Sequence, residues 1–188
     1  MPVRASMIVC GASGIGKTCM IRRLAEGKFS STAPTVGVDF GVLRIGSILR
    51  LDVYDLSGAD CFVEARVDFY RDAVIILFVF DVRSFSNDMM GLESWFDEAS
   101  RCGLPSTARR FIVGTHCDND GAGSGRGNAE SVEIMKLWAS ARNSIFFQVG
   151  ALTGFGVSEA LDLLAKSAAE ALSEKVGTEK IKTFPAVT

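Results

Sequence analysis

Short apolar segments alternate along the chain with segments of helical periodicity. Six of the apolar segments have the length of a β-strand, and they cover residues 6–10, 36–45, 48–54, 73–80, 110–115 and 145–149. In the third segment, Leu49, Leu51 and Val53 alternate with Arg50, Asp52 and Tyr54, which is typical of a strand with one face on the core. The first segment and the last three are apolar without alternation. This pattern indicates strands that helices cover on both faces, as in a parallel sheet.

The segments between the expected strands have apolar residues spaced three and four apart. The helices expected from this spacing cover residues 17–26, 61–72, 87–102, 129–142 and 157 to about 172. Strands that alternate with helices predict an α/β fold, in which a six-stranded, mostly parallel sheet carries helices on both faces. Gly46 and Ser47 are placed to turn the second strand back onto the third, so we expect one antiparallel strand at the edge of the sheet.

Composition indicates one globular domain and excludes several other classes of protein. The chain has 188 residues, of which 48% are hydrophobic and 22% charged. The formal net charge is -2 and no block of like charge is present, so no nucleic-acid partner is expected. The longest apolar run covers residues 73–80, far fewer than the roughly 20 that a membrane-spanning helix requires. Five irregularly spaced cysteines predict free thiols and a cytoplasmic location.

The segment after the first expected strand carries a complete nucleotide-binding motif. Residues 11–18 read GASGIGKT, which matches GxxxxGK[ST] directly before an expected helix. In such a P-loop, backbone N–H groups turn inward around phosphate oxygens, and the positive end of the helix points at them. We expect Lys17 to reach the β- and γ-phosphates and Thr18 to offer its hydroxyl to Mg²⁺. The residues expected at the phosphates are Ser13, Gly14, Ile15, Gly16, Lys17, Thr18 and Cys19. The motif predicts a P-loop NTPase.

Two further segments distinguish among the classes of P-loop protein. Residues 34–40 read PTVGVDF and residues 55–58 read DLSG. These segments resemble the effector loop and the DxxG motif of the Rab family of Ras-like small GTPases. The resemblance extends from about residue 7 to residue 172, and it implies a small G domain over residues 1–175 that binds GTP or GDP with Mg²⁺. A P-loop small-molecule kinase is the weaker alternative, because we can place neither a substrate lid nor catalytic arginines.

The resemblance also implies roles around the γ-phosphate. Thr35 would ligate Mg²⁺ and contact the γ-phosphate, Asp55 would hold the ion through water, and Gly58 would donate its N–H to the γ-phosphate. For Asp55, a carboxylate that caps a turn is the alternative. The residues expected to act in hydrolysis are therefore Lys17, Thr35 and Gly58, with Thr18, Thr35 and Asp55 at the metal. Loss of the γ-phosphate would relax the loops near residues 33–40 and 57–72, through which we expect effector proteins to bind.

Ala59 departs from the family pattern directly after DxxG. The family has a Gln there that orients the attacking water, and a methyl group cannot do so. Slow hydrolysis is therefore expected. The same substitution motivates a second interpretation, in which the chain is a binding module of the same fold that recognises partners with little or no hydrolysis.

The resemblance places three residues of the base-binding site where the family has them, and a fourth beside them. Asp118, in the position of the last residue of NKxD, would accept two N–H groups from the guanine edge. Ala151 would meet the guanine carbonyl through its N–H, with Leu152 beside it, and Phe29 would pack against the ring. These contacts would distinguish guanine from adenine.

The first two positions of NKxD are altered. Thr115 stands where the family has an Asn that braces this loop against the P-loop and contacts the base, and one hydroxyl cannot supply both the donor and the acceptor of an amide. Weaker guanine binding is expected. His116 replaces the Lys whose stem lies on the ring, and an imidazole can stack there instead.

The last residues, 176–188, are expected to form a tail outside the domain. They lack the cysteine pair that Rab proteins have prenylated, so no lipid anchor is expected. Either a natural tail is missing, or the protein works in the cytosol or is held at an endomembrane by a partner. The expected partners are effectors, an exchange factor and an activating protein, and the chain is expected to be a monomer. Residues 120–128 (DGAGSGRGN) are expected to form a loop.

Overall fold

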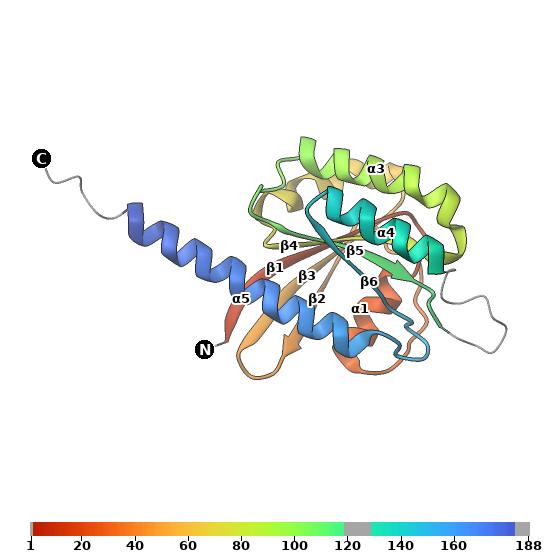
Figure 1. Ribbon diagram of the computed structural model, residues 1–188, viewed down its shortest axis with the longest axis horizontal. Coiled ribbons are helices and arrows are strands. Elements are labelled where there is room, and N and C mark those ends of the chain that lie inside the picture. The colour runs from red at the N-terminus through yellow and green to blue at the C-terminus, as the bar shows by residue number, and fades with distance from the viewer. Residues whose placement is uncertain (1, 119–128, 183–188) are drawn as a thin grey trace, which may run out of the picture.

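The strands form a single sheet in the order β2-β3-β1-β4-β5-β6 (Figure 1). The computed structural model describes residues 2–118 and 129–182, and all statements of structure refer to these residues. The strands are β1 (Val3–Cys10), β2 (Val38–Ile45), β3 (Leu49–Leu56), β4 (Ile75–Asp81), β5 (Arg109–Thr115) and β6 (Ser144–Gln148). The edge strand β2 pairs with β3 in an antiparallel direction, and the other neighbours are parallel. The predicted mostly parallel sheet is confirmed.

Burial along the strands follows the sequence pattern. In β3, Leu49, Leu51 and Val53 are buried, while the residues between them are half-buried, so one face of the strand lies on the core. Every residue of β4 is buried, because helices cover both faces of this central strand.

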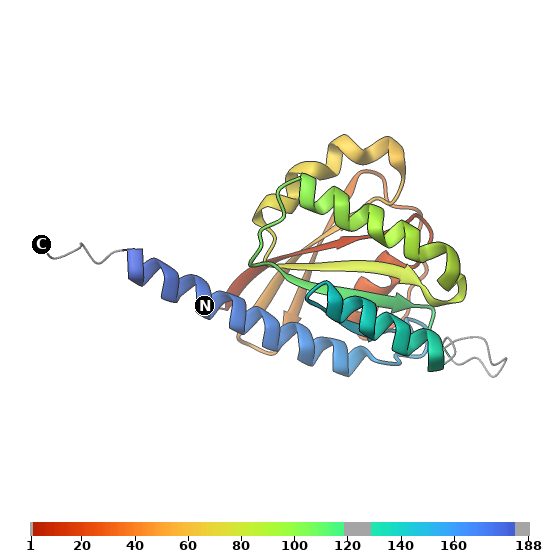
Figure 2. The same cartoon turned by 45° about the horizontal axis from the view of Figure 1, so that its top comes forward.

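Five α-helices cover the two faces of the sheet. They are α1 (Lys17–Glu26), α2 (Val63–Arg66), α3 (Phe85–Arg101), α4 (Ala129–Ala141) and α5 (Val157–Lys182). One core contains side chains of α1 and α5, and the other contains side chains of α3 and α4. Figure 2 shows α3 and α5 on opposite sides of the sheet. Within the described ranges, no helix combines the length and the apolar character that crossing a bilayer requires.

Two of the expected helices differ from the structure. Residues 61–72 were expected to form one helix, but they form a 3₁₀ turn (Asp60–Phe62), the short helix α2 and a second 3₁₀ segment (Val67–Asp72). Arg66 and Tyr70 are buried here, so their four-residue spacing reflects burial against a neighbouring helix and not one continuous α-helix. The helix α5 continues ten residues past its expected end, since the Glu and Lys residues that follow are good helix formers without an apolar stripe. The expected loop at 120–128 lies outside the described residues.

The parallel strands bring the functional segments to one edge of the sheet. The P-loop follows β1, Asp55 lies near the end of β3, and Thr115 is the last residue of β5. Because the carboxyl ends of parallel strands meet at the same edge, these residues lie together although they are up to a hundred positions apart in sequence.

Candidate nucleotide-binding site

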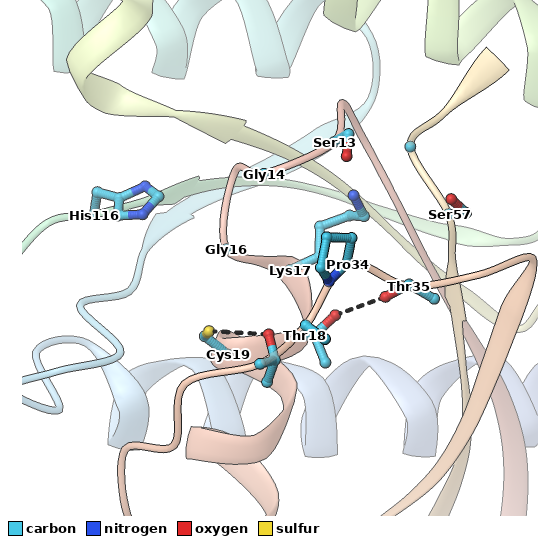
Figure 3. Close-up of a pocket in the computed structure, with 13 residues that line it drawn as sticks. Ser13, Gly14, Gly16, Lys17, Thr18, Cys19, Pro34, Thr35, Ser57 and His116 are labelled. Atoms are coloured by element: carbon cyan, nitrogen blue, oxygen red, sulfur yellow. Dashed lines mark hydrogen bonds between the residues drawn. The ribbon is translucent and has the colours of Figure 1, made fainter.

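A cavity of about 220 Å³ opens at this edge of the sheet (Figure 3). It is lined by the P-loop, by the first turn of α1, by residues 32–35, by Ser57 and Gly58, and by His116. Figure 3 shows His116 and Ser57 on opposite sides of the cavity, with Lys17 between them. The structure therefore gathers residues from three other segments around the predicted phosphate-binding loop.

The P-loop turns sharply into α1 at Gly16. This residue has φ 85°, a left-handed conformation that glycine adopts without strain. A Cβ atom at Gly16 would also lie only 3.3 Å from Cε1 of His116. Any other residue at position 16 would thus be strained in its backbone and crowded by the imidazole.

The Lys17 side chain lies inside the P-loop. Its Nζ donates hydrogen bonds to the carbonyl oxygens of Gly11 and Ala12, at 2.9 and 2.7 Å, and the residue is 6% exposed. Burial lowers the pKa of the Lys17 ammonium group, and the nearby Asp55 carboxylate opposes that shift. The cation is therefore fixed at the wall of the cavity, where an anionic ligand would be attracted to it.

Three side chains with oxygen atoms lie together at the first turn of α1. The hydroxyls of Thr18 and Thr35 lie 3.0 Å apart (Figure 3). The Thr18 hydroxyl donates a short hydrogen bond to Oδ2 of Asp55, and the Thr35 hydroxyl lies 3.3 Å from the same oxygen. Oδ1 of Asp55 is buried and has no hydrogen-bond partner among the described residues. This set of hard oxygen ligands, with one carboxylate oxygen unused, is of the kind that Mg²⁺ prefers.

Burial raises the pKa of the Asp55 carboxyl, and the hydrogen bonds from Thr18 and the charge of Lys17 oppose that shift. Placing an uncompensated carboxylate in this position is costly, so a cation beside it would be stabilised. The turn-capping alternative for Asp55 is not supported by its contacts, which go to Thr18 and Thr35 and join the P-loop to the segment around Thr35.

Gly58 lies against the backbone of the P-loop. A Cβ atom at this position would lie 2.3 Å from the carbonyl carbon of Ala12 and from the backbone nitrogen of Ser13, so only glycine fits. The preceding residue, Ser57, donates its N–H to the carbonyl of Gly37 at 2.8 Å. The DxxG segment is thereby connected to both the P-loop and the loop that contains Thr35.

Thr115 contacts the P-loop through its hydroxyl. Its hydroxyl lies 2.6 Å from the carbonyl oxygen of Ile15 and 2.9 Å from that of Phe80, and the residue is 3% exposed. The single hydroxyl hydrogen serves one of these acceptors at a time. Because the hydroxyl is occupied and buried, Thr115 keeps the bracing role of the family's Asn but does not reach the cavity.

His116 reaches the cavity from the next position. It has φ 58°, and its Nδ1 lies 3.1 Å from Oδ2 of Asp81. Burial lowers the pKa of the imidazole, and the charge of Asp81 partly opposes that shift. The Cε1 and Nε2 edge then lies toward Gly16 of the P-loop.

A family model described as "Ras family" matches residues 6–170. The chain belongs to the Ras family of small GTPases. Among its relatives, Ras-related protein Rab-13 of Canis lupus familiaris is 30% identical over 167 residues, which cover 85% of this chain and 77% of the relative. Ras-related protein Rab7 of Prunus armeniaca is 31% identical over 173 residues, which cover 86% and 80%. The predicted resemblance and fold are confirmed.

A second kind of relative is longer than this Ras-family chain. DnaJ homolog subfamily C member 27 of Rattus norvegicus is 30% identical over 161 residues, which cover 84% of this chain and 58% of the relative. The chain thus spans less than two thirds of that protein's length.

Of the residues predicted to contact the base, His116 lines the cavity, whereas Phe29, Asp118, Ala151 and Leu152 do not. Oδ1 of Asp118 accepts hydrogen bonds from the backbone N–H and the hydroxyl of Thr153, at 2.7 and 2.9 Å, so it lies against the loop that contains Ala151 and Leu152. Leu152 is 55% exposed, and Phe29 is 43% exposed. Asp118 is thus brought to the loop of Ala151 and Leu152. Their roles toward a base stay predictions.

Four residues that line the cavity were not predicted from the sequence. Thr32, Ala33 and Pro34 precede Thr35, and Ser57 precedes Gly58. Cys19 and Thr32 also lie together, with Sγ and Oγ1 3.4 Å apart. The sequence could have indicated them only through their position next to predicted site residues, because a loop that brings Thr35 to the cavity also brings its neighbours.

Proposed function

We propose that this Ras-family protein is a guanine-nucleotide switch of Rab type, which binds GTP or GDP with Mg²⁺ and hydrolyses GTP slowly. The observation that carries the proposal is the convergence of Thr18, Thr35 and Asp55 beside the buried Lys17. A cation fixed at a P-loop and an oxygen-rich metal site next to it fit a nucleotide polyphosphate with its ion.

The site residues fit Mg²⁺ at one position. Thr18 and Thr35 would offer their hydroxyl oxygens, and Asp55 would hold the ion through water, as the family pattern implies. When bound, the ion would neutralise charge on the phosphates. Two residues of the chain would bind the phosphates directly. Lys17 would attract them through its charge, and Gly58 would offer a backbone N–H beside the P-loop.

Slow hydrolysis follows from the side chain at position 59. Ala59 has only a methyl group where the family has the Gln that orients water, and its backbone N–H lies 3.4 Å from the Ser57 hydroxyl. Among the residues that line the cavity, Ser57 offers a hydroxyl near this position. The unaided rate in the family is about 10⁻⁴ to 10⁻³ s⁻¹, and we propose a slower rate for this chain.

Effector binding is proposed for the surface that joins residues 33–40 to residues 57–72. An aromatic row crosses this surface, with ring centroids 5.4 Å apart for Phe40 and Tyr54 and 5.1 Å apart for Tyr54 and Phe69. Phe40 is 54% exposed and Val36 is 77% exposed. An aromatic row that is exposed at Phe40 and lies between two segments that would respond to the γ-phosphate would let a partner distinguish the two nucleotide states.

A role in intracellular vesicle traffic is proposed on the likeness to the Rab-named relatives, together with a cytoplasmic location, effectors, an exchange factor and an activating protein. The monomeric state and the division at residue 175 stay predictions. The relative named as a DnaJ homolog contributes no partner to this proposal, because the chain covers 58% of it.

A second candidate is a binding module that holds nucleotide without turning it over. Two residues favour the binding module. Ala59 lacks the amide that orients water, and the Thr115 hydroxyl is buried and would make no hydrogen bond to a base. The two candidates differ in the rate of hydrolysis and in base preference.

Purified protein should be denatured and the released nucleotide separated by chromatography. GDP or GTP supports the switch, no nucleotide or a mixture of bases supports the binding module, and ADP or ATP supports a kinase. Single-turnover hydrolysis of bound GTP should then be compared with that of Ala59→Gln. We expect the variant to be faster, and a wild-type rate equal to or above that of Ala59→Gln would refute the slow-switch proposal.

A further inference from the structure

A buried arginine outside the cavity holds the backbone of the DxxG segment. Nη1 of Arg66 donates hydrogen bonds to the carbonyl oxygens of Ser57 and Ala59, at 3.1 and 2.9 Å. These two carbonyls flank Gly58 on either side. One guanidinium nitrogen thus fixes the peptide groups around the residue that lies against the P-loop.

The remaining guanidinium nitrogens anchor Arg66 to α3. Nε and Nη2 donate to Oε1 and Oε2 of Glu98, each at 2.7 Å, which is a bidentate ion pair. The side chain of Arg66 is 2% exposed and that of Glu98 is 13% exposed, so the pair is shielded from water and from salt.

Two aromatic residues complete the anchor. The Tyr70 hydroxyl donates to Oε1 of Glu98 at 2.7 Å, and the indole ring of Trp95 lies 4.4 Å from the centre of the Arg66 guanidinium. Burial alone would raise the pKa of the Glu98 carboxyl. The hydrogen bonds from Arg66 and Tyr70 nevertheless hold this pKa below its ordinary value. Figure 2 shows α3 packed along the sheet, so the anchor is connected to the rigid part of the fold.

We propose that Arg66 is the positioning residue that keeps the Gly58 backbone against the P-loop, and that this position strengthens the binding of a γ-phosphate. The proposal rests on the proposed nucleotide binding. The P-loop and Lys17 would bind the phosphates shared by GDP and GTP, whereas Gly58 would meet only the third. Arg66 acts on backbone carbonyls, so its effect does not depend on the side chain at position 59.

The choice of variants follows from the burial of the pair. Replacing Arg66 alone by an apolar residue would leave the Glu98 carboxylate buried and unpaired, which destabilises strongly. The double variant Arg66→Met with Glu98→Gln removes both charges and leaves an amide oxygen for Tyr70. Arg66→Lys keeps the charge opposite Glu98, but one ammonium group cannot reach Glu98 and both carbonyls in the same geometry.

Arg109→Met is the matched control. Arg109 forms an ion pair with Glu174 of similar length, 2.6 Å, but at the start of β5 and at the other edge of the sheet from the cavity. This variant also loses an arginine that is bound to a carboxylate, without any link to residues 57–59.

Affinities for GDP and for a non-hydrolysable GTP analogue should be measured by fluorescent titration in the full-length chain. In the double variant we expect GDP affinity to change by less than about twofold and analogue affinity to fall by about tenfold, with a partial effect in Arg66→Lys. Arg109→Met should leave the ratio unchanged. An unchanged ratio in variants that are folded at the assay temperature would overturn the proposal.

Hydrogen exchange of the amides of residues 57–60, measured without nucleotide, separates this proposal from the proposed function. Exchange should be faster in both Arg66 variants and unchanged in Arg109→Met, whether or not nucleotide binds. If the wild type binds no guanine nucleotide, the proposed function is wrong, and the exchange rates still decide whether Arg66 holds Gly58. Exchange equal to the wild type in both Arg66 variants would overturn the positioning role.

Discussion

Replacing Thr115 by Val tests whether one hydroxyl braces the P-loop. Val has nearly the shape of Thr, so the substitution replaces the hydroxyl by a methyl group and removes the hydrogen-bond donor. In the wild type the hydroxyl lies 2.6 Å from the Ile15 carbonyl and 2.9 Å from the Phe80 carbonyl, in a position that is 3% exposed. The variant leaves a buried acceptor without its donor.

The magnitude follows from the cost of that unpaired acceptor. A neutral hydrogen bond contributes about 0.5–1.5 kcal/mol, and a buried group left unsatisfied costs about 1–3 kcal/mol. We therefore expect the free energy of unfolding to fall by about 1–3 kcal/mol. In a domain of this size each kcal/mol corresponds to about 2–4 °C in Tm. Urea denaturation and thermal unfolding measure this change directly.

The nucleotide affinity distinguishes a brace from ordinary packing. Thr115→Ser keeps the hydroxyl and loses one methyl group, which costs about 1 kcal/mol of stability. Both variants should therefore be less stable than the wild type. Only Thr115→Val should release bound nucleotide faster, because only this variant frees the Ile15 carbonyl within the P-loop. Equal dissociation rates for the two variants would refute the bracing role of Thr115.

Three further predictions concern the cavity and its borders. Lys17→Ala should abolish tight nucleotide binding in a fluorescent titration, because it removes the cation fixed at the P-loop, and wild-type affinity in this variant would exclude the P-loop assignment. Asp118→Ala should weaken GDP binding while inosine diphosphate, which lacks the exocyclic amine, is affected less, and equal losses for both would contradict the base role. Burial lowers the pKa of His116, so the unfolded chain takes up a proton first as the pH falls below about 6.5, and stability should decrease in that range. Since the chain has one histidine, His116→Phe should flatten the pH dependence of urea unfolding between pH 5 and 7, and an unchanged slope would refute the assignment.

The sheet was predictable because local hydrophobic patterns indicate both the strands and whether helices cover one or both of their faces. The continuous apolar run at β4 and the alternation in β3 each correspond to the observed burial. The segment at residues 60–72 was not predictable from the same kind of signal. Arg66 and Tyr70 are buried there against Glu98 of α3, which lies 32 and 28 positions away in sequence. Hydrophobic periodicity indicates that a residue is buried but not which element buries it. The pattern therefore could not distinguish one long helix from a short helix between two 3₁₀ segments.

Residues of the candidate site were predictable where a motif fixes their spacing. Lys17, Thr18 and Asp55 are placed by the P-loop and DxxG patterns, and they meet in the structure. The function of Thr115 could not be derived in this way. The sequence shows that an amide is missing, but only the structure shows that the hydroxyl reaches the Ile15 carbonyl.

The altered positions differ in their expected roles from the retained ones. Ala59 and Thr115 stand where the family has groups that act on the water and on the base, whereas Lys17, Thr18, Thr35 and Asp55, the residues proposed to bind the phosphates and the metal, are retained. Interactions that bind ground-state nucleotide do not by themselves accelerate hydrolysis, because acceleration needs contacts that strengthen in the transition state. The Arg66 contact belongs with the interactions that bind ground-state nucleotide. It orders the backbone around Gly58 through carbonyl oxygens and needs no side chain at position 59. Under the proposed function, this chain therefore keeps the residues that would bind nucleotide and order the loops, and it has Ala59 where the family has the amide that orients water.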